Sequence, residues 1–269
     1  MSEASILTQK CKMIEIIIIG SASGYPSADR ACSSFLLNID GKLYQFDVGE
    51  GSASSMVKQK FDHSKIGTII ISHAHADHII GLFMEIQLMH LAKRNERLVI
   101  YIPDEVRSAV EQFLIATYLF KERMGFEIEI RSIQPDPVFR DEKITVYARP
   151  NSHLAGYKST IDDACYPNKM QSYSYVIKTD TRRIIYSGDI GSLNDFADLL
   201  PECDLLITEG LYLDLEKLFE AVAENKVEYL LLTHLSDPTY LNPEHIKNLA
   251  AKYGVINLHI ADDGFRLRI

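Results

Sequence analysis

Runs of apolar residues bounded by turn-forming residues recur along the chain and predict strands that alternate with helices. Residues 14–19 contain five isoleucines, a β-branched composition typical of a buried strand that opens the fold. Residues 35–39 and 42–46 flank the dipeptide Asp40-Gly41, a strong two-residue hairpin signal. Further apolar runs that predict strands are residues 66–72, 97–102, 126–130, 144–152, 183–188, 227–233, 256–260 and 265–269.

Helical spacing of apolar residues occurs at residues 82–95 and 213–224. A third helix is expected over residues 103–124, and a fourth over residues 243–253, with Asn242 as N-cap and Pro243 in the first turn. The one long irregular stretch is residues 156–171. Repeats, low-complexity tracts and interdomain linkers are absent from the sequence, so residues 1–269 are expected to form a single α/β domain in which residues 1–12 are flexible.

Candidate chemistry is concentrated directly after the apolar run 66–72, in the sequence His-Ala-His-Ala-Asp-His. His73, His75, Asp77 and His78 offer three imidazoles and one carboxylate within six residues. Histidines packed for stability rarely reach this density, and such a donor set suits zinc, with manganese and iron as competitors. The loop therefore predicts a metal site.

Three more donors follow apolar runs in the same way. His153 follows residues 144–152, Asp189 follows residues 183–188, and His234 follows residues 227–233. Ligands that follow strands converge where the strands end at one edge of a sheet, which is the usual place of an active site in layered α/β proteins. Because one loop already supplies four donors, the whole set predicts two metal ions.

The order of these donors resembles the metallo-β-lactamase superfamily and, within it, the ribonuclease Z family of tRNA 3′-processing endonucleases. Three shorter segments carry the resemblance further. Residues 27–34 are similar to the family's loop with Arg and Ser, residues 46–51 (FDVGEG) to its Phe-Asp-Cys-Gly-Glu-Gly turn, and residues 232–236 (LTHLS) to its Leu-Thr-His-Phe-Ser segment. The resemblance runs from about residue 14 to residue 236.

The resemblance implies a four-layer αββα sandwich with two divalent metal ions at the edge of its sheets. One ion would be held by His73, His75 and His153, the other by Asp77, His78 and His234, with Asp189 between them. Asp77 is also placed to accept a proton from the attacking water. Asp47 and Glu209 are the remaining candidate catalytic residues, because ligand imidazoles usually need a second group to orient them.

The chain also departs from the family's pattern. Residues 156–174 are too few for the helical arm that grips tRNA in the family, and no histidine stands between His153 and His234 to match its assisting histidine. The family's Arg-Tyr pair is replaced by residues 237–240 (DPTY). With 37 acidic against 28 basic residues the net charge is −9, which opposes the binding of a long phosphate backbone. A long nucleic acid is therefore not expected as a partner.

These observations together predict a dinuclear-metal-dependent phosphodiesterase, in which two ions share a water and a small or cyclic phosphodiester is the substrate. A ribonuclease Z-type nuclease and a carboxylic ester or thioester hydrolase of the same fold stay open as alternatives. An oxygen-reducing diiron centre is disfavoured, because proteins of that kind usually carry a carboxylate at the position of His75. The candidate substrate-binding residues are Arg30 and Ser33 in the first of the family-like segments, and Tyr157 and Lys158 in the irregular stretch.

Location and assembly have weaker signals. Cys11, Cys32, Cys165 and Cys203 are widely spaced, which is typical of free thiols in a reducing cytoplasm. Signal-peptide and membrane-spanning patterns are absent from the sequence, so a cytoplasmic location and no membrane partner are expected. The resemblance leaves a homodimer open as the oligomeric state.

Overall fold

The computed structural model describes residues 13–134, 136–237 and 242–269. Residues 1–12, for which the sequence predicts flexibility, lie outside the described residues, and so do residues 238–241. Cys32, Cys165 and Cys203 are free thiols, and Cys11 falls in the part of the chain that is not described. Among the described residues, no helix has the length and apolar character needed to cross a membrane.

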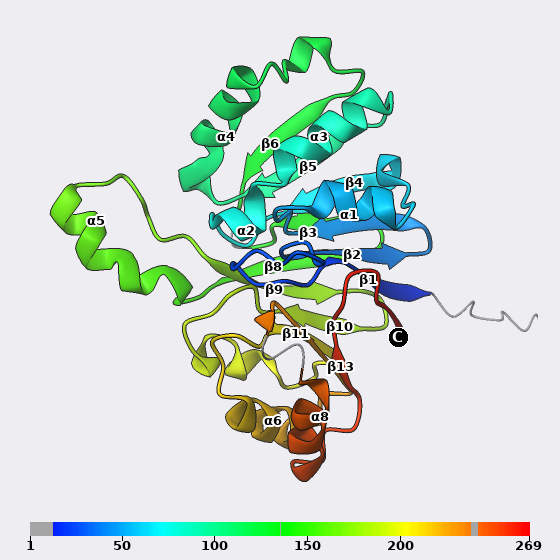
Figure 1. The fold of residues 1–269 in the computed structure, drawn as a ribbon, viewed down its shortest axis with the longest axis vertical. Coiled ribbons are helices and arrows are strands. Elements are labelled where there is room, and N and C mark those ends of the chain that lie inside the picture. Colours follow the sequence, from blue (N-terminus) through cyan, green and yellow to red (C-terminus); the bar gives the residue numbers. More distant parts are fainter. Residues whose placement is uncertain (1–12, 135, 238–241) are drawn as a thin grey trace, which may run out of the picture.

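Two seven-stranded sheets form the centre of the molecule (Figure 1). The first sheet has the strand order β14-β1-β2-β3-β4-β5-β6, and the second has the order β13-β12-β11-β10-β9-β8-β7. The strands of the first sheet are β1 (Ile14–Gly20), β2 (Ser34–Ile39), β3 (Lys42–Phe46), β4 (Ile66–Ile70), β5 (Leu98–Ile102), β6 (Ile128–Ser132) and β14 (Arg266–Arg268). Those of the second are β7 (Phe139–Arg140), β8 (Thr145–Pro150), β9 (Tyr173–Lys178), β10 (Arg183–Tyr186), β11 (Leu205–Glu209), β12 (Tyr229–Thr233) and β13 (Leu258–Ile260).

Helices cover the outer face of each sheet (Figure 1). Over the first sheet lie α1 (Ser52–Lys58), α3 (Leu82–Leu91) and α4 (Asp104–Ala116), and over the second lie α6 (Leu215–Glu224) and α8 (Pro243–Lys252). The layers therefore run helix, sheet, sheet, helix, which confirms the predicted αββα sandwich.

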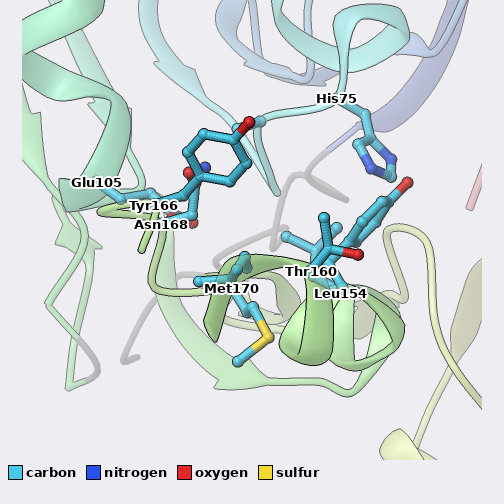
Figure 2. A pocket seen from close by; sticks show the side chains of 10 residues that line it. His75, Glu105, Leu154, Thr160, Tyr166, Asn168 and Met170 are labelled. Atoms are coloured by element: carbon cyan, nitrogen blue, oxygen red, sulfur yellow. The ribbon is translucent and has the colours of Figure 1, made fainter. Parts of the chain in front are cut away.

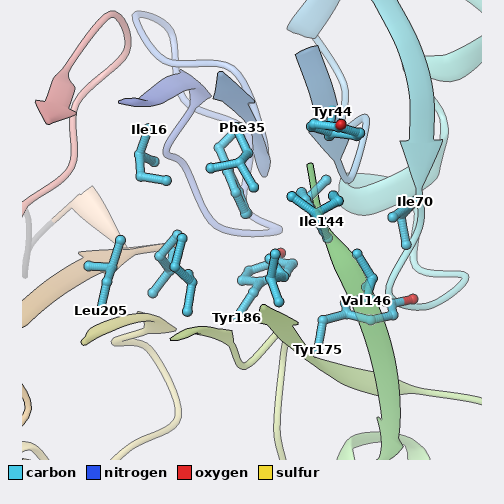
Figure 3. Packing of buried hydrophobic residues seen from close by; sticks show 14 of the residues in the cluster. Ile16, Phe35, Tyr44, Ile70, Ile144, Val146, Tyr175, Tyr186 and Leu205 are labelled. Atoms are coloured by element: carbon cyan, nitrogen blue, oxygen red, sulfur yellow. The ribbon is translucent and has the colours of Figure 1, made fainter. Parts of the chain in front are cut away.

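The apolar runs are continuous because both faces of the central strands are buried. In β1, Ile16 and Ile18 belong to the core between the sheets, whereas Ile17 and Ile19 pack under the helices of the first sheet. Figure 3 shows the first of these cores, where Ile16 and Phe35 of the first sheet face the side chains of the second sheet. Alternate side chains of one strand thus hold two layers together.

The predicted hairpin is confirmed. β2 and β3 pair antiparallel up to Ile39 and Lys42, and the two residues between them, Asp40 and Gly41, both have positive φ, of 50° and 88°. Left-handed backbone at both central positions is the geometry of a type I′ turn, which Asp-Gly sequences favour.

The helix expected over residues 103–124 ends early, at Ala116. Tyr118 adopts a left-handed conformation with φ 61°, and the amide of Leu119 donates a hydrogen bond to the carbonyl of Leu114. Leu114, on the buried face of α4, and Leu119 belong to the same apolar core, so the helix closes in a Schellman-type end. Glycine, the usual sequence signal for such an end, is absent there.

Residues 156–171, expected to be irregular, contain a short helix instead. A 3-10 turn (His153–Tyr157) leads into α5 (Lys158–Ala164), which projects from the body of the molecule (Figure 1). The ammonium of Lys158 lies 2.8 Å from the carboxylate of Asp162, one helical turn further on. No residue of α5 is buried, so the helix has no apolar face that could have revealed it in the sequence.

A buried carboxylate lies between the first sheet and its helices. Glu85 of α3 is fully buried and its Oε1 accepts a hydrogen bond of 2.9 Å from Nε2 of Gln45, which also donates to Ser34. Burial raises the pKa of Glu85 to about 7. The folded protein therefore keeps the proton of Glu85 over a pH range in which the unfolded chain has lost it.

This difference predicts how stability depends on pH. Because the folded pKa is raised, the contribution of Glu85 is fully present below about pH 4.5 and is lost as the pH rises through about 7. Glu85→Gln removes the titration. We therefore expect the difference in free energy of unfolding between the variant and the unchanged protein to shift in favour of the variant by roughly 2–3 kcal/mol from pH 5 to pH 8. Urea denaturation at both pH values measures it, with Glu220→Gln on the exposed face of α6 as control. A gain that does not change with pH would contradict the prediction.

Candidate metal centre

The loop after β4 supplies four of the candidate ligands. Ile71 still pairs with β5, and the chain then leaves the sheet. α2 (Ala76–Ile79) begins with His75 as its N-cap. This single helical turn places the ring of His78 at 4.2 Å from the ring of His73.

The second sheet supplies the other three candidate ligands. His153 follows β8, Asp189 follows β10, and His234 directly follows β12 in a left-handed conformation with φ 53°. Asn151 ties the first two loops together, since its Nδ2 donates to the carbonyl of Asp189 at 2.9 Å and its Oδ1 accepts from the amide of His153 at 3.2 Å. Asn151 was not among the predicted site residues. In the sequence, its position two residues before His153 is the one feature that could have indicated a role at the site.

The structure brings all seven predicted ligands together as two groups that share Asp189. In each group the donor atoms lie within 4.8 Å of one another. The members of the first group are His73, His75, His153 and Asp189, and those of the second are Asp77, His78, His234 and Asp189. These are the two sets that the resemblance implies.

Pairs of donor atoms within each group face a common point. Nε2 of His153 lies 3.1 Å from Nδ1 of His75, and Nε2 of His234 lies 3.0 Å from Oδ2 of Asp77. Asp189 reaches both groups, because its Oδ2 lies 3.7 Å from Nε2 of His153 and 3.5 Å from Nε2 of His234. A carboxylate in this position can bridge two cations.

Unpartnered buried atoms test whether the residues fit metal ions. Nε2 of His73 is buried and has no hydrogen-bond partner among the described residues, and Nε2 of His78 and Oδ1 of Asp189, also buried, lie 3.3 Å apart without a well-aligned hydrogen bond. Leaving such atoms unsatisfied costs roughly 1–3 kcal/mol each, so their presence at one place indicates a missing partner. Imidazole and carboxylate donors at this spacing fit divalent cations such as zinc, manganese or iron.

The protonation states of three histidines and two carboxylates agree with that fit, whereas neighbouring carboxylates outweigh burial and raise the pKa of His78. Burial lowers the pKa of His73, His75 and His153, and a neutral imidazole is the form that binds a metal. Burial alone would raise the pKa of Asp77 and of Asp189, but the neighbouring imidazoles outweigh it and hold both carboxyl groups well below their usual range. Both carboxylates are thus ionised at neutral pH.

Asp47 holds the imidazole of His78 from the side opposite the cluster. Its Oδ2 accepts hydrogen bonds from Nδ1 of His78 at 2.8 Å, Oγ of Ser72 at 2.8 Å and the hydroxyl of Tyr186 at 2.5 Å. Its Oδ1 accepts from the amide of Ser72 at 2.6 Å. With Nδ1 engaged, only Nε2 of His78 is left to face the cluster. The orienting role of Asp47 stays a prediction.

Glu209 has contacts other than those expected. Its Oε2 accepts hydrogen bonds from the amides of Leu211 at 2.7 Å and Tyr212 at 2.8 Å, and burial raises its pKa to about 7. The carboxyl group therefore fixes the turn after β11. That turn places the ring of Tyr212 at 5.8 Å from the ring of His153 and 6.4 Å from that of His234. Tyr212, whose role the sequence does not reveal, lies beside both groups of donors.

Arg30 and Ser33 are buried. The guanidinium of Arg30 donates to the carbonyl of Ser21 at 3.3 Å and to that of Leu235 at 3.0 Å, and lies 2.5 Å from the carboxylate of Asp237. These contacts join the loop after β1 to the loop after β12. A contact of Arg30 or Ser33 with substrate stays a prediction that the structure does not test.

Tyr157 and Lys158 lie where the chain enters α5. The ring of Tyr157 is 5.8 Å from the ring of His75, and 51% of the residue is exposed, so it stands at the open side of the cluster. The ammonium of Lys158 is directed along α5 to Asp162. Of the two predicted substrate contacts, the geometry favours Tyr157.

Comparison with known proteins places this site in a family. The model of the β-lactamase superfamily domain matches residues 46–255. A ribonuclease Z from Clostridium perfringens is 26% identical over 94% of this chain and 97% of its own length. Among solved structures, the metallo-β-lactamase fold protein YhfI from Bacillus subtilis has a TM-score of 0.73 at 22% identity, covering 95% of this chain and 99% of its own. The short form of human tRNase Z has a TM-score of 0.70 at 21% identity, covering 94% and 98%.

These relatives correct one expectation. The expectation that a long nucleic acid is not a partner of the chain is wrong, because a relative that aligns over 97% of its own length is named a ribonuclease. The argument from net charge failed because the −9 is a sum over the whole surface. Binding at a metal site depends on the local charge, which the ions themselves dominate.

The shared position of Asp189 leads to a prediction about metal content. Asp189→Ala removes a donor from both groups, so we expect it to lower the zinc content from two ions per chain to less than one. His153→Ala removes a donor from one group only and should leave about one ion. Elemental analysis after dialysis measures the content, with His259→Ala in β13, outside both groups, as control. Two ions retained by Asp189→Ala would contradict the two-group arrangement.

The contacts of Asp47 lead to a second prediction. Asp47→Asn replaces one carboxylate oxygen by an amide nitrogen, which cannot accept the hydrogen bond that Oδ2 of Asp47 accepts from Nδ1 of His78, so we expect the affinity for the more weakly held zinc ion to fall by about 10–100-fold. Tyr186→Phe removes one hydrogen bond from the same carboxylate but leaves the contact with His78, and should have a smaller effect. Competition with a chromogenic chelator measures both affinities. Equal affinities in the two variants would show that Asp47 does not act through His78.

Proposed function

The chain belongs to the β-lactamase superfamily, and from that premise we propose that it is a metal-dependent phosphodiesterase that cleaves RNA as a ribonuclease Z-type endonuclease. The observation that carries the proposal is the complete set of seven convergent donors around Asp189. The donors alone do not distinguish phosphorus from carbon as the atom attacked. The name of a relative that aligns over nearly the whole chain favours the phosphodiester of RNA.

The two groups of donors would hold two divalent ions, whose chemistry is to lower the pKa of a water and to neutralise charge that develops on phosphoryl oxygens. Asp77 stands on the more open side of the cluster, with 15% of its side chain exposed. Its Oδ2 lies 3.0 Å from Nε2 of His234, and the ionised carboxylate can accept the proton that an attacking water loses. Gly24 leaves the room for this carboxylate, since a Cβ there would lie 3.0 Å from Oδ2.

Two exposed tyrosines support a nucleic-acid substrate. Tyr157 and Tyr212, 51% and 60% exposed, lie beside the cluster next to His75 and His153 respectively. Aromatic rings in such a place can stack on the unpaired bases of RNA. Burial, with the carboxylates of Asp189 and Glu209, raises the pKa of Tyr212, so its hydroxyl keeps its proton and can donate a hydrogen bond to a substrate oxygen.

The charge at the site is compatible with this substrate. Two dications would bring four positive charges against the two carboxylates of Asp77 and Asp189. The pocket would then attract a phosphodiester although the chain as a whole is acidic.

A small phosphodiester, such as a cyclic nucleotide, is a second candidate that one observation favours. Between His153 and β9 the chain forms only the short helix α5, and beside it a cavity of about 340 Å³ borders His75. Cavities of roughly 300–1,000 Å³ are typical of small-molecule sites.

The proposal predicts metal-dependent cleavage of phosphodiesters. Zinc- or manganese-loaded protein should cleave a pre-tRNA with a 3′ trailer, and more slowly bis(p-nitrophenyl) phosphate. Asp77→Ala removes both a donor and the proton acceptor, so we expect the rate to fall by about 10²–10⁴-fold. Turnover assays with each substrate and with 3′,5′- and 2′,3′-cyclic nucleotides measure it. Asp162→Ala, on the exposed face of α5, is the control.

Each alternative has its own result. Cleavage of cyclic nucleotides without cleavage of the pre-tRNA would replace the proposal by the second candidate. Turnover of carboxylic esters or thioesters alone, by protein shown to hold two ions, would overturn the phosphodiesterase proposal altogether.

A further inference from the structure

A cavity lies on one side of the candidate metal centre, between α5 and the start of α4. Figure 2 shows His75 at one side of it, Tyr166, Asn168 and Glu105 at the other, and Leu154, Thr160 and Met170 below them. Its volume is about 340 Å³. His75 is the only one of the seven candidate ligands in its wall, so whatever enters the cavity lies one side chain away from the cluster.

The far wall of the cavity is built by the chain that returns from α5. Cys165, with φ 55°, ends the helix in a left-handed conformation, and the amide of Tyr166 donates to the carbonyl of Ile161. This closure turns the chain back towards the body of the molecule. It leaves Tyr166 at the wall, with 58% of the residue exposed.

Hydrogen bonds fix this returning chain to the first turn of α4. The two oxygens of Glu105 accept from the amides of Lys169 and Gln171, and the amide of Glu105 donates in turn to Oε1 of Gln171 at 2.9 Å. The ammonium of Lys169 lies 2.8 Å from the carboxylate of Asp104. The wall that carries Tyr166 is therefore held at both ends, by α5 and by α4.

The chemistry of the lining excludes a phosphate and favours a flat uncharged group. Lysine and arginine are absent from the described residues that line the cavity, and both oxygens of its one carboxylate, Glu105, accept backbone hydrogen bonds. Tyr157, beside His75, and Tyr166, on the far wall, offer aromatic rings, and Leu154 and Met170 offer apolar contact. Asn168 and Thr160 supply the few polar atoms that could read an edge bearing donors and acceptors.

We propose that this cavity binds the base of a nucleotide next to the scissile phosphodiester, with the base stacked on Tyr166. The inference rests on the proposed function and names the subsite through which it selects substrates. Only the side chain of His75 separates the cluster of donors from the cavity. This spacing suits one nucleotide, whose phosphate would lie at the cluster and whose base would lie in the cavity. The exposure of Tyr166 is also explained, because a stacking ring must have a free face.

The test compares phosphodiesters that carry a nucleoside with one that carries none. Substrates are the thymidine 5′- and 3′-(p-nitrophenyl phosphates), with methyl p-nitrophenyl phosphate as the diester without a nucleoside. We expect Tyr166→Ala to lower kcat/KM for at least one thymidine diester by about 5–100-fold, the usual range for loss of one stacked base. The methyl diester should change less than about twofold. Tyr166→Phe keeps the ring and should restore the thymidine activity, and Tyr118→Ala, an exposed tyrosine beyond α4, is the matched control.

Failure of the subsite and failure of the proposed function give different results. Equal effects of Tyr166→Ala on all three diesters, or no effect on any, would overturn the subsite while the phosphodiesterase activity stands. If the unchanged protein cleaves neither these diesters nor the pre-tRNA, the proposed function fails, and equilibrium dialysis of the zinc-loaded protein with adenosine 5′-monophosphate then tests the cavity by itself. Retention that Tyr166→Ala abolishes would support the subsite, and equal retention by both proteins would overturn it.

Discussion

One buried carboxylate joins the two sheets behind the candidate metal centre. Asp47 lies at the end of β3, is fully buried and has a left-handed backbone with φ 54°. Its two oxygens take part in four hydrogen bonds, two with Ser72 at the end of β4, one with His78 and one with Tyr186 on β10 of the other sheet. A polar side chain is tolerated in a core only with such partners. The loop that carries four donors and the strand that precedes Asp189 are therefore fixed by the same side chain.

Most of the fold and all seven candidate donors could be predicted because both depend on local patterns. Strands buried on two faces appear as continuous apolar runs, of which residues 14–19 are the clearest, and the αββα layers follow from their alternation with helices. The donors stand where those runs end, as in His153 after β8 and His234 after β12. Their convergence is now a structural finding, whereas their role as metal ligands is still a proposal.

What could not be predicted depends on contacts between distant segments or on elements without a buried face. Nothing near Arg30 in the sequence reveals that Asp237, more than two hundred positions later, pairs with its guanidinium. Tyr186 likewise reads as an ordinary strand residue until β10 is seen opposite Asp47. α5 was not predicted because it has no buried face, and amphipathic periodicity arises only where a helix packs against a core.

Because α5 has no buried face, the proposed selection of substrates is separate from the stability of the fold. α5 contributes no buried residue to the core, so side chains on it and on the chain that returns from it can change without unfolding the sheets. The returning chain is nevertheless ordered by Glu105, which belongs to the first turn of α4. A segment that is dispensable to the core yet fixed at both ends is what a specificity element requires, because binding then does not need to order a free loop. In the proposed function the cluster of donors would hold the ions that support the reaction, and the wall beside His75 would determine which phosphodiester reaches them.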